Sequence, residues 1–121
     1  MLEGTLIMES LRVGTRLDNL TLTTRRISRY RPGSLAPGQP EIWTAIDFEA
    51  ADADADELAR VFAVVLDEPG WYANLQSAAE SFIVFPGRVF RYPRGDAGGR
   101  GHAQAYGRRL AIPEPQLDWT V

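Results

Sequence analysis

The sequence predicts an α+β domain, with a mostly antiparallel sheet of about six strands and two helices packed on one face. Three observations lead to this fold class. Apolar and polar residues alternate over residues 41–50, which indicates a strand. Apolar residues recur at helical spacing over residues 58–66, which indicates a helix lying on a sheet. Two aromatic runs flank Pro86 and Gly87, which indicates a hairpin over residues 82–92.

The chain has 121 residues and is expected to form a single domain, residues 1–121. Its first two strands are expected over residues 6–13 and 20–30, joined near Gly14. The second is rich in threonine, which favours strands, and in arginine, which suits an edge or an open face. The segment 32–40 holds three prolines and two glycines in nine residues, which predicts a surface loop rather than a domain boundary.

The first helix is expected to begin at Asp54. Asp54 and Glu57 have the spacing of a capping box in its aspartate variant. Pro69 and Gly70 are expected to end the segment, because neither residue continues a helix. The apolar stripe of this helix consists of Leu58, Val61, Phe62, Val65 and Leu66.

After the first helix, three more strands are expected over residues 71–76, 81–85 and 88–92. These strands and the three before them complete the sheet. The order of three strands, a helix, three strands and a helix implies a mostly antiparallel sheet with the helices on one face.

A second helix is expected over residues 97–111, with Asp96 as its cap. Four glycines fall within it, and each weakens a helix by about 1 kcal/mol relative to alanine. Packing must therefore hold it in place. The segment 112–119 predicts an extended tail that docks back on the body through Leu117 and Trp119.

The composition excludes several chemistries. There is no cysteine and no lysine, and all 13 basic residues are arginine. Disulfides, thiolate ligands, lysine Schiff bases and the P-loop lysine are therefore excluded. The net charge of −3 is divided unevenly, with +3 over residues 1–32, −8 over residues 41–70 and +2 over residues 71–121. A weakly acidic total argues against a general nucleic-acid binder.

The start of the chain has no basic segment followed by a long apolar run, so no signal peptide is expected. No stretch is apolar for the length that a bilayer requires. The expected location is the cytoplasm, with no membrane partner.

Five blocks of the chain carry motifs that are specific as a set, at residues 9–12, 70–72, 85–96, 105–108 and 112–119. With these motifs the chain resembles a family of small bacterial proteins described as conserved hypothetical. The resemblance spans nearly the whole chain and implies no activity, cofactor or catalytic residue.

The best candidate site is an anion site in the loop from Gly95 to Gly101. Glycines leave backbone N–H groups free, the start of the next helix is electropositive, and two arginines could clamp a phosphate or a carboxylate. The alternative is a flexible turn. The residues of this site are Arg94, Gly98, Gly99, Arg100 and His102.

His102 is the single histidine and could act as a general base beside Asp96 or Glu80. The alternative is a surface histidine, because no nucleophile is visible beside it. No metal site or cofactor is expected. The carboxylates over residues 52–57 partly match a calcium loop but lack its central glycine and its distal glutamate, so helix capping explains them better.

Arginines alternate with aromatic residues over 88–94, and more arginines lie in the strand over 20–30. Such a surface could stack on nucleic-acid bases. The favoured alternative is packing of the strand, with cation–π contacts and pairing to the acidic segment 41–70.

The expected function is a non-catalytic interaction or small-ligand-binding module. A homodimer through the sheet is a possible partner, because Trp43 and Trp71 are large for outward strand positions unless the tail or a second subunit covers them. The alternative is a small enzyme or effector-binding protein that acts on a small anionic ligand at the loop 95–101.

Overall fold

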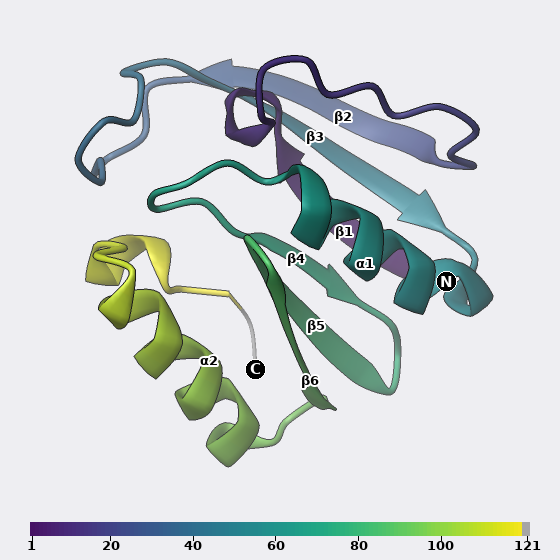
Figure 1. Cartoon of the computed structure of the whole chain (residues 1–121). Coiled ribbons are helices and arrows are strands. Elements are labelled where there is room, and N and C mark those ends of the chain that lie inside the picture. The colour runs from purple at the N-terminus through teal and green to yellow at the C-terminus, as the bar shows by residue number, and fades with distance from the viewer. Residues whose placement is uncertain (120–121) are drawn as a thin grey trace.

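A computed structural model describes residues 1–119, which form one six-stranded antiparallel sheet and two α-helices (Figure 1). The α+β prediction is confirmed. The strand order across the sheet is β2-β3-β1-β4-β5-β6. The elements are β1 (Leu2–Ile7), β2 (Thr23–Tyr30), β3 (Trp43–Ala50), α1 (Ala55–Val65), β4 (Ala73–Gln76), β5 (Glu80–Phe85), β6 (Arg88–Pro93) and α2 (Ala97–Arg109).

The first strand lies earlier in the chain than the sequence predicts. The expectation of a strand over residues 6–13 is wrong, because β1 ends at Ile7 and a 3-10 turn follows. The Glu9 carboxylate accepts a hydrogen bond from the backbone N–H of Thr44 at 2.6 Å, and so takes the place of a further ladder bond. β3 separates β1 from β2, so the two expected N-terminal strands are not neighbours.

Gly4 lies in the middle of β1, where glycine usually weakens a strand. A Cβ atom at this position would lie 2.6 Å from the side chains of both Leu75 and Phe48. The glycine therefore lets two apolar side chains from neighbouring strands meet over β1.

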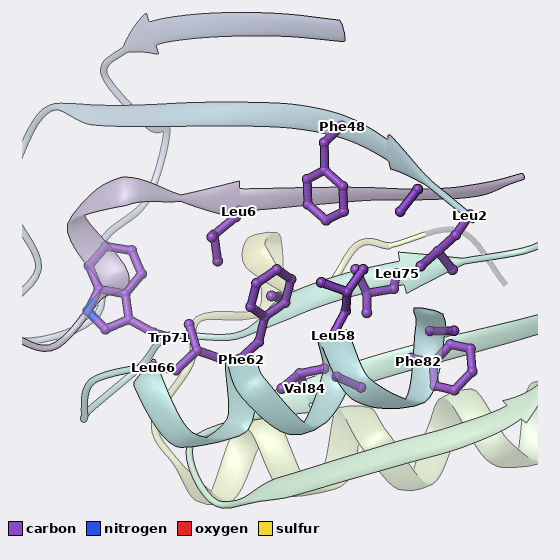
Figure 2. Packing of buried hydrophobic residues seen from close by; sticks show 14 of the residues in the cluster. Leu2, Leu6, Phe48, Leu58, Phe62, Leu66, Trp71, Leu75, Phe82 and Val84 are labelled. Carbon is purple, nitrogen blue, oxygen red and sulfur yellow. The ribbon is translucent and has the colours of Figure 1, made fainter. Parts of the chain in front are cut away.

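The main core lies between α1 and one face of the sheet, and Figure 2 shows the side chains of Leu58 and Phe62 pointing from α1 into it. The rings of Phe62 and Phe48 meet edge to face at 6.0 Å. The predicted stripe is confirmed at Leu58, Phe62 and Leu66, which are buried. The predicted cap is wrong, because Asp54 ends a 3-10 turn in helical conformation and its side chain makes no capping hydrogen bond.

The two helices lie on opposite faces of the sheet, so the prediction that both pack on one face is wrong. Successive side chains of a strand point to opposite faces. In β5, Phe82 and Val84 belong to the core under α1, whereas Ile83 and Phe85 pack with α2 and the tail. Figure 1 shows α1 over β1 and β4, and α2 beside β6.

The hairpin of β5 and β6 about Pro86 and Gly87 is confirmed, with Phe85 opposite Arg88. The two arginines of β6 lie over aromatic rings, and Arg91 also pairs with Glu80 and Asp56. Arg88 lies 4.7 Å from the ring centre of Phe90, and Arg91 lies 5.1 Å from that of Phe82. The packing interpretation of this run is therefore confirmed.

α2 approaches the sheet closely because of its glycines. A Cβ atom at Gly99 would lie 2.4 Å from the Cβ atom of Tyr92. The tail packs beside α2 on the same face of the sheet, and its predicted docking is confirmed, since Leu117 and Trp119 are buried in the cluster with Phe85 and Tyr92. The indole N–H of Trp119 donates a hydrogen bond of 2.8 Å to the Tyr92 hydroxyl group.

None of the helices within residues 1–119 has the length and apolar character that crossing a membrane requires.

Candidate functional site

The residues of the predicted anion site are engaged with other parts of the chain. Arg94 donates to the backbone carbonyl oxygen of Ser77 at 3.2 Å, and Arg100 donates to that of Trp119 at 3.0 Å. Arg94 thus binds the turn before β5, and Arg100 binds the tail.

The start of α2 already has an anionic partner, because the Asp96 carboxylate accepts from the Gly98 backbone N–H at 3.0 Å. Gly99 packs against β6 and His102 is exposed. Of the carboxylates expected beside His102, Asp96 forms the cap and Glu80 is bound by Arg91 at 2.6 and 2.7 Å. The hydrogen bond from Arg91 lowers the pKa of Glu80. The anion site stays a prediction.

A different part of the molecule is hollowed. On the face of the sheet that carries α2, the helix and the tail pack on β5 and β6. On that face several side chains of β1, β3 and β4 remain partly exposed, among them Thr5, Asp47 and Asn74. Thr5 lies at their centre, opposite Asp47 on one side and Asn74 on the other.

Over these strands lies a cavity of about 410 Å³, which we call the tail cavity. Three segments that are far apart in the sequence enclose it above the strands: the loop after β2, the segment before β4 and the tail. Its lining residues are Thr5, Ile7, Tyr30, Pro32, Gly33, Ser34, Trp43, Gly70, Trp71, Tyr72, Asn74, Pro115, Gln116 and Asp118.

Hydrogen bonds between these segments hold the rim of the tail cavity. The Gln116 side-chain amide donates to the Ser34 carbonyl oxygen at 3.0 Å and to Gln39 Oε1 at 3.1 Å. Gln39 is buried, and its own amide donates to the Gly70 carbonyl oxygen at 2.9 Å. The Tyr72 hydroxyl group donates to the backbone carbonyl oxygen of Gln116. The rim is therefore a connected polar network rather than a set of loose loops.

Four aromatic side chains line the tail cavity, two tyrosines and two tryptophans. The rings of Trp43 and Trp71 lie 5.0 Å apart, and Tyr30 meets Trp43 edge to face at 6.3 Å. The indole N–H of Trp43 donates to the Pro40 carbonyl oxygen at 2.9 Å. Its hydrogen-bonding group is therefore satisfied, and the residue is buried at the border between the cavity and the main core.

The tail cavity is electrostatically negative. Among the described lining residues Asp118 is the one charged side chain, and no arginine is present. Asp47 lies beside the cavity, where its carboxylate accepts from the Thr5 hydroxyl group at 2.7 Å. Burial raises the pKa of Tyr30, and the negative charges of Asp47, Glu9 and Asp118 raise it further.

The same two causes act on the second tyrosine. Burial raises the pKa of Tyr72, and the charge of Asp118 adds to the effect. Both tyrosines are therefore neutral hydroxyl groups over the physiological pH range.

A second cavity of about 290 Å³ adjoins the first, and both are lined by Thr5 and Asn74. It continues along β1, with Glu3 opposite Glu49 and Gln76. Arg25 forms an ion pair with Glu49 at its border. The two cavities form a groove along the open face of the sheet, aromatic at one end and charged at the other.

The groove does not assemble a nucleophile with a histidine base. The chain has no cysteine or lysine, and the described residues that line both cavities include no histidine. Within residues 1–119, no group of three or more histidine, aspartate or glutamate side chains could hold a metal ion. The lining combines aromatic residues with a few polar groups.

The fold and the groove define a small α+β domain with an open sheet face that the C-terminal tail partly covers. Comparisons of the chain with protein-family models, with curated proteins and with solved structures gave no match.

Sequence reasoning did not single out the groove. The sequence feature that could have indicated the groove is the pair Trp43 and Trp71, which are expected at outward positions on strands. Both are buried within the single chain, at 7% and 6% exposure. The contacts of Gln39 and Gln116 that build the rim have no signature in the local sequence.

Proposed function

We propose that this protein is a non-catalytic small-ligand-binding module and that its ligand occupies the tail cavity. The observation that carries the proposal is the cavity itself, about 410 Å³ in volume with four aromatic residues in its walls. Ligand sites commonly have volumes of about 300–1,000 Å³, with mostly apolar walls and a few polar groups that orient the ligand.

The organisation of the rim supports this proposal. Gln116, Gln39 and Tyr72 join the tail, the loop after β2 and the segment before β4 through hydrogen bonds. Because these segments are already held in place, few protein side chains or loops would need to become ordered when a ligand binds. Less binding free energy is then lost to conformational entropy.

The other candidates receive less support. A macromolecular interaction module calls for a flat apolar patch, whereas the open sheet face carries Thr5, Asp47, Asn74 and Gln76. The enzyme or effector-binding alternative at the loop 95–101 calls for free arginines, whereas Arg94 and Arg100 already bind backbone carbonyl oxygens.

The proposal places the protein in the cytoplasm, because a chain without cysteine suits a reducing compartment. A homodimer stays a prediction. The burial of Trp43 and Trp71 within one chain removes one of the two reasons for it, and the other is that two helices leave part of a six-stranded sheet uncovered. Light scattering over a wide concentration range tests it, since a monomer throughout would contradict it.

The test of the binding function is a two-dimensional amide NMR titration of the ¹⁵N-labelled full chain. The probes are a panel of small amines, sugars and amino acids, together with sodium phosphate. We expect at least one organic compound to shift the resonances of Thr5, Tyr72 and Gln116 in a saturable way. Asn74→Phe, which fills the middle of the groove, should abolish that shift.

Gln76→Phe is the matched control. It places the same side chain on the same face two residues further along β4, where it lines the adjoining cavity and not the tail cavity. It should leave the shift intact. Phosphate shifts confined to residues 95–101 would favour the anionic alternative. A panel without any saturable shift around the tail cavity would contradict the proposed function.

A further inference from the structure

We infer that the ligand of the tail cavity is an organic cation, recognised through an alkylated ammonium group. This inference rests on the proposed function and adds the chemical class of the ligand to it.

The aromatic walls supply the first argument. An ammonium group is attracted to the face of an aromatic ring, and sites that bind methylated ammonium groups are lined by several such rings. Tyr30, Trp43, Trp71 and Tyr72 are among its lining residues. Trp43 and Trp71 are also buried in the main core, so the two tyrosines present more of their ring surface. The N–H of Trp43 and the hydroxyl group of Tyr72 are already bound to backbone carbonyl oxygens. Neither donor is therefore free to bond to a ligand, and contact with these residues would be made through their rings.

The charges of the residues that line the tail cavity also favour a cation. The chain has 13 arginines, and none of them is among the described residues that line the tail cavity. The charged side chain there is Asp118, and Asp47 lies beside Thr5 at the floor. Within the tail cavity a carboxylate or phosphate ligand would meet Asp118 and no arginine, because Arg26, opposite Asp47, lines the adjoining cavity. An ammonium group would be attracted by Asp118.

The pKa values of the two tyrosines also reflect the negative charge near the cavity. Burial is the main cause that raises the pKa of Tyr30 and of Tyr72. The charges of Asp47, Glu9 and Asp118 raise that of Tyr30 further, and the charge of Asp118 raises that of Tyr72. A field that opposes the formation of a phenolate in the cavity favours a positive charge at the same place.

A methylated ammonium fits this site better than a bare one. It is weakly hydrated, so entry into an aromatic cavity costs little desolvation free energy, and its methyl groups pack against the rings. The exposed carboxylate of Asp118 then serves as a counter-charge at the mouth rather than as a buried ion-pair partner.

The test compares choline with 3,3-dimethyl-1-butanol, which has the same shape but a carbon atom in place of the charged nitrogen. Isothermal titration calorimetry of the full chain at constant ionic strength gives both affinities. Choline should bind at least about tenfold more tightly, which corresponds to a cation–π contribution of about 1.4 kcal/mol. Choline should also quench tryptophan fluorescence with the same midpoint.

Asp118→Asn should weaken choline binding severalfold and leave the binding of the alcohol unchanged. Glu114→Gln is the matched control, because it removes the same charge from the same tail at a residue that does not line the cavity. It should leave both affinities unchanged.

Equal affinities for choline and the alcohol would overturn the cation inference while leaving the cavity as a binding site. An absence of saturable choline binding would overturn it as well, and the NMR panel would still decide the proposed function. Equal losses from Asp118→Asn and Glu114→Gln would mean that net charge, rather than the cavity, attracts the cation, and would also overturn it.

Discussion

The Tyr72 hydroxyl group donates a hydrogen bond to the backbone carbonyl oxygen of Gln116, 44 residues later in the chain. This bond joins the segment before β4 to the C-terminal tail and closes one side of the tail cavity. The ring of Tyr72 also packs on Trp119 and Phe85, at 5.2 and 6.0 Å. One tyrosine thus connects the second core, the tail and the candidate site.

Tyr72→Phe tests this connection. The substitution keeps the ring and removes the donor, so the free energy of unfolding should fall by about 0.5–1.5 kcal/mol. Urea denaturation measures the change. Tyr106→Phe is the matched control, because Tyr106 packs on Phe85 and its hydroxyl group has no hydrogen-bond partner among the described residues. An equal loss from both variants would contradict a stabilising role for the Gln116 bond.

The ionisation of Tyr30 and Tyr72 predicts how stability changes with alkaline pH. Both have pKa values raised above the ordinary value of 10.0, first by burial and then by nearby carboxylates. Above pH 10 the unfolded chain releases these protons and the folded chain retains them, so stability is full below about pH 10 and falls as pH rises. Urea midpoints across this range should show the fall, and it should be smaller in Tyr72→Phe. If Tyr72→Phe lost as much stability above pH 10 as the unsubstituted protein, the contribution of Tyr72 to this pH dependence would be contradicted.

Much of the fold could be predicted because local patterns and tertiary packing agree. The alternation over residues 41–50 corresponds to β3, and the aromatic runs about Pro86 form the β5–β6 hairpin. The sequence does not predict the position of β1, because a glycine such as Gly4 is unusual inside a strand. Its presence there is explained by the side chains of Leu75 and Phe48, which occupy the space that a Cβ atom would need.

One feature of the sequence indicates that the two helices lie on opposite faces of the sheet. The run Phe82–Phe85 is apolar without interruption, which is typical of a strand buried on both faces. The candidate site had no comparable signal. Its rim depends on Gln39 bonding to Gly70 and Gln116, 31 and 77 residues away, and a polar residue in a proline-rich loop gives no indication of such partners.

The caps of the two helices differ, and this difference is measurable. Asp96 accepts a hydrogen bond from Gly98 at the start of α2, whereas Asp54 makes no such bond at α1. Asp96→Ala should lower the free energy of unfolding by about 1 kcal/mol, and Asp54→Ala should have a much smaller effect. Urea titrations of both variants provide the comparison. A larger loss from Asp54→Ala would contradict the observed caps.

The glycines of α2 should respond oppositely to substitution by alanine. A Cβ atom at Gly99 would lie 2.4 Å from Tyr92, so Gly99→Ala must push the helix away from β6 and should cost about 1–3 kcal/mol. Gly101, one half-turn later, has no atom within 4 Å of the corresponding position. Gly101→Ala should therefore stabilise the protein by up to about 1 kcal/mol through helix propensity. Thermal and urea unfolding of the two variants give the sign of each change. Stabilisation by Gly99→Ala would mean that α2 does not pack closely on Tyr92, and destabilisation by Gly101→Ala would mean that this side of the helix is covered.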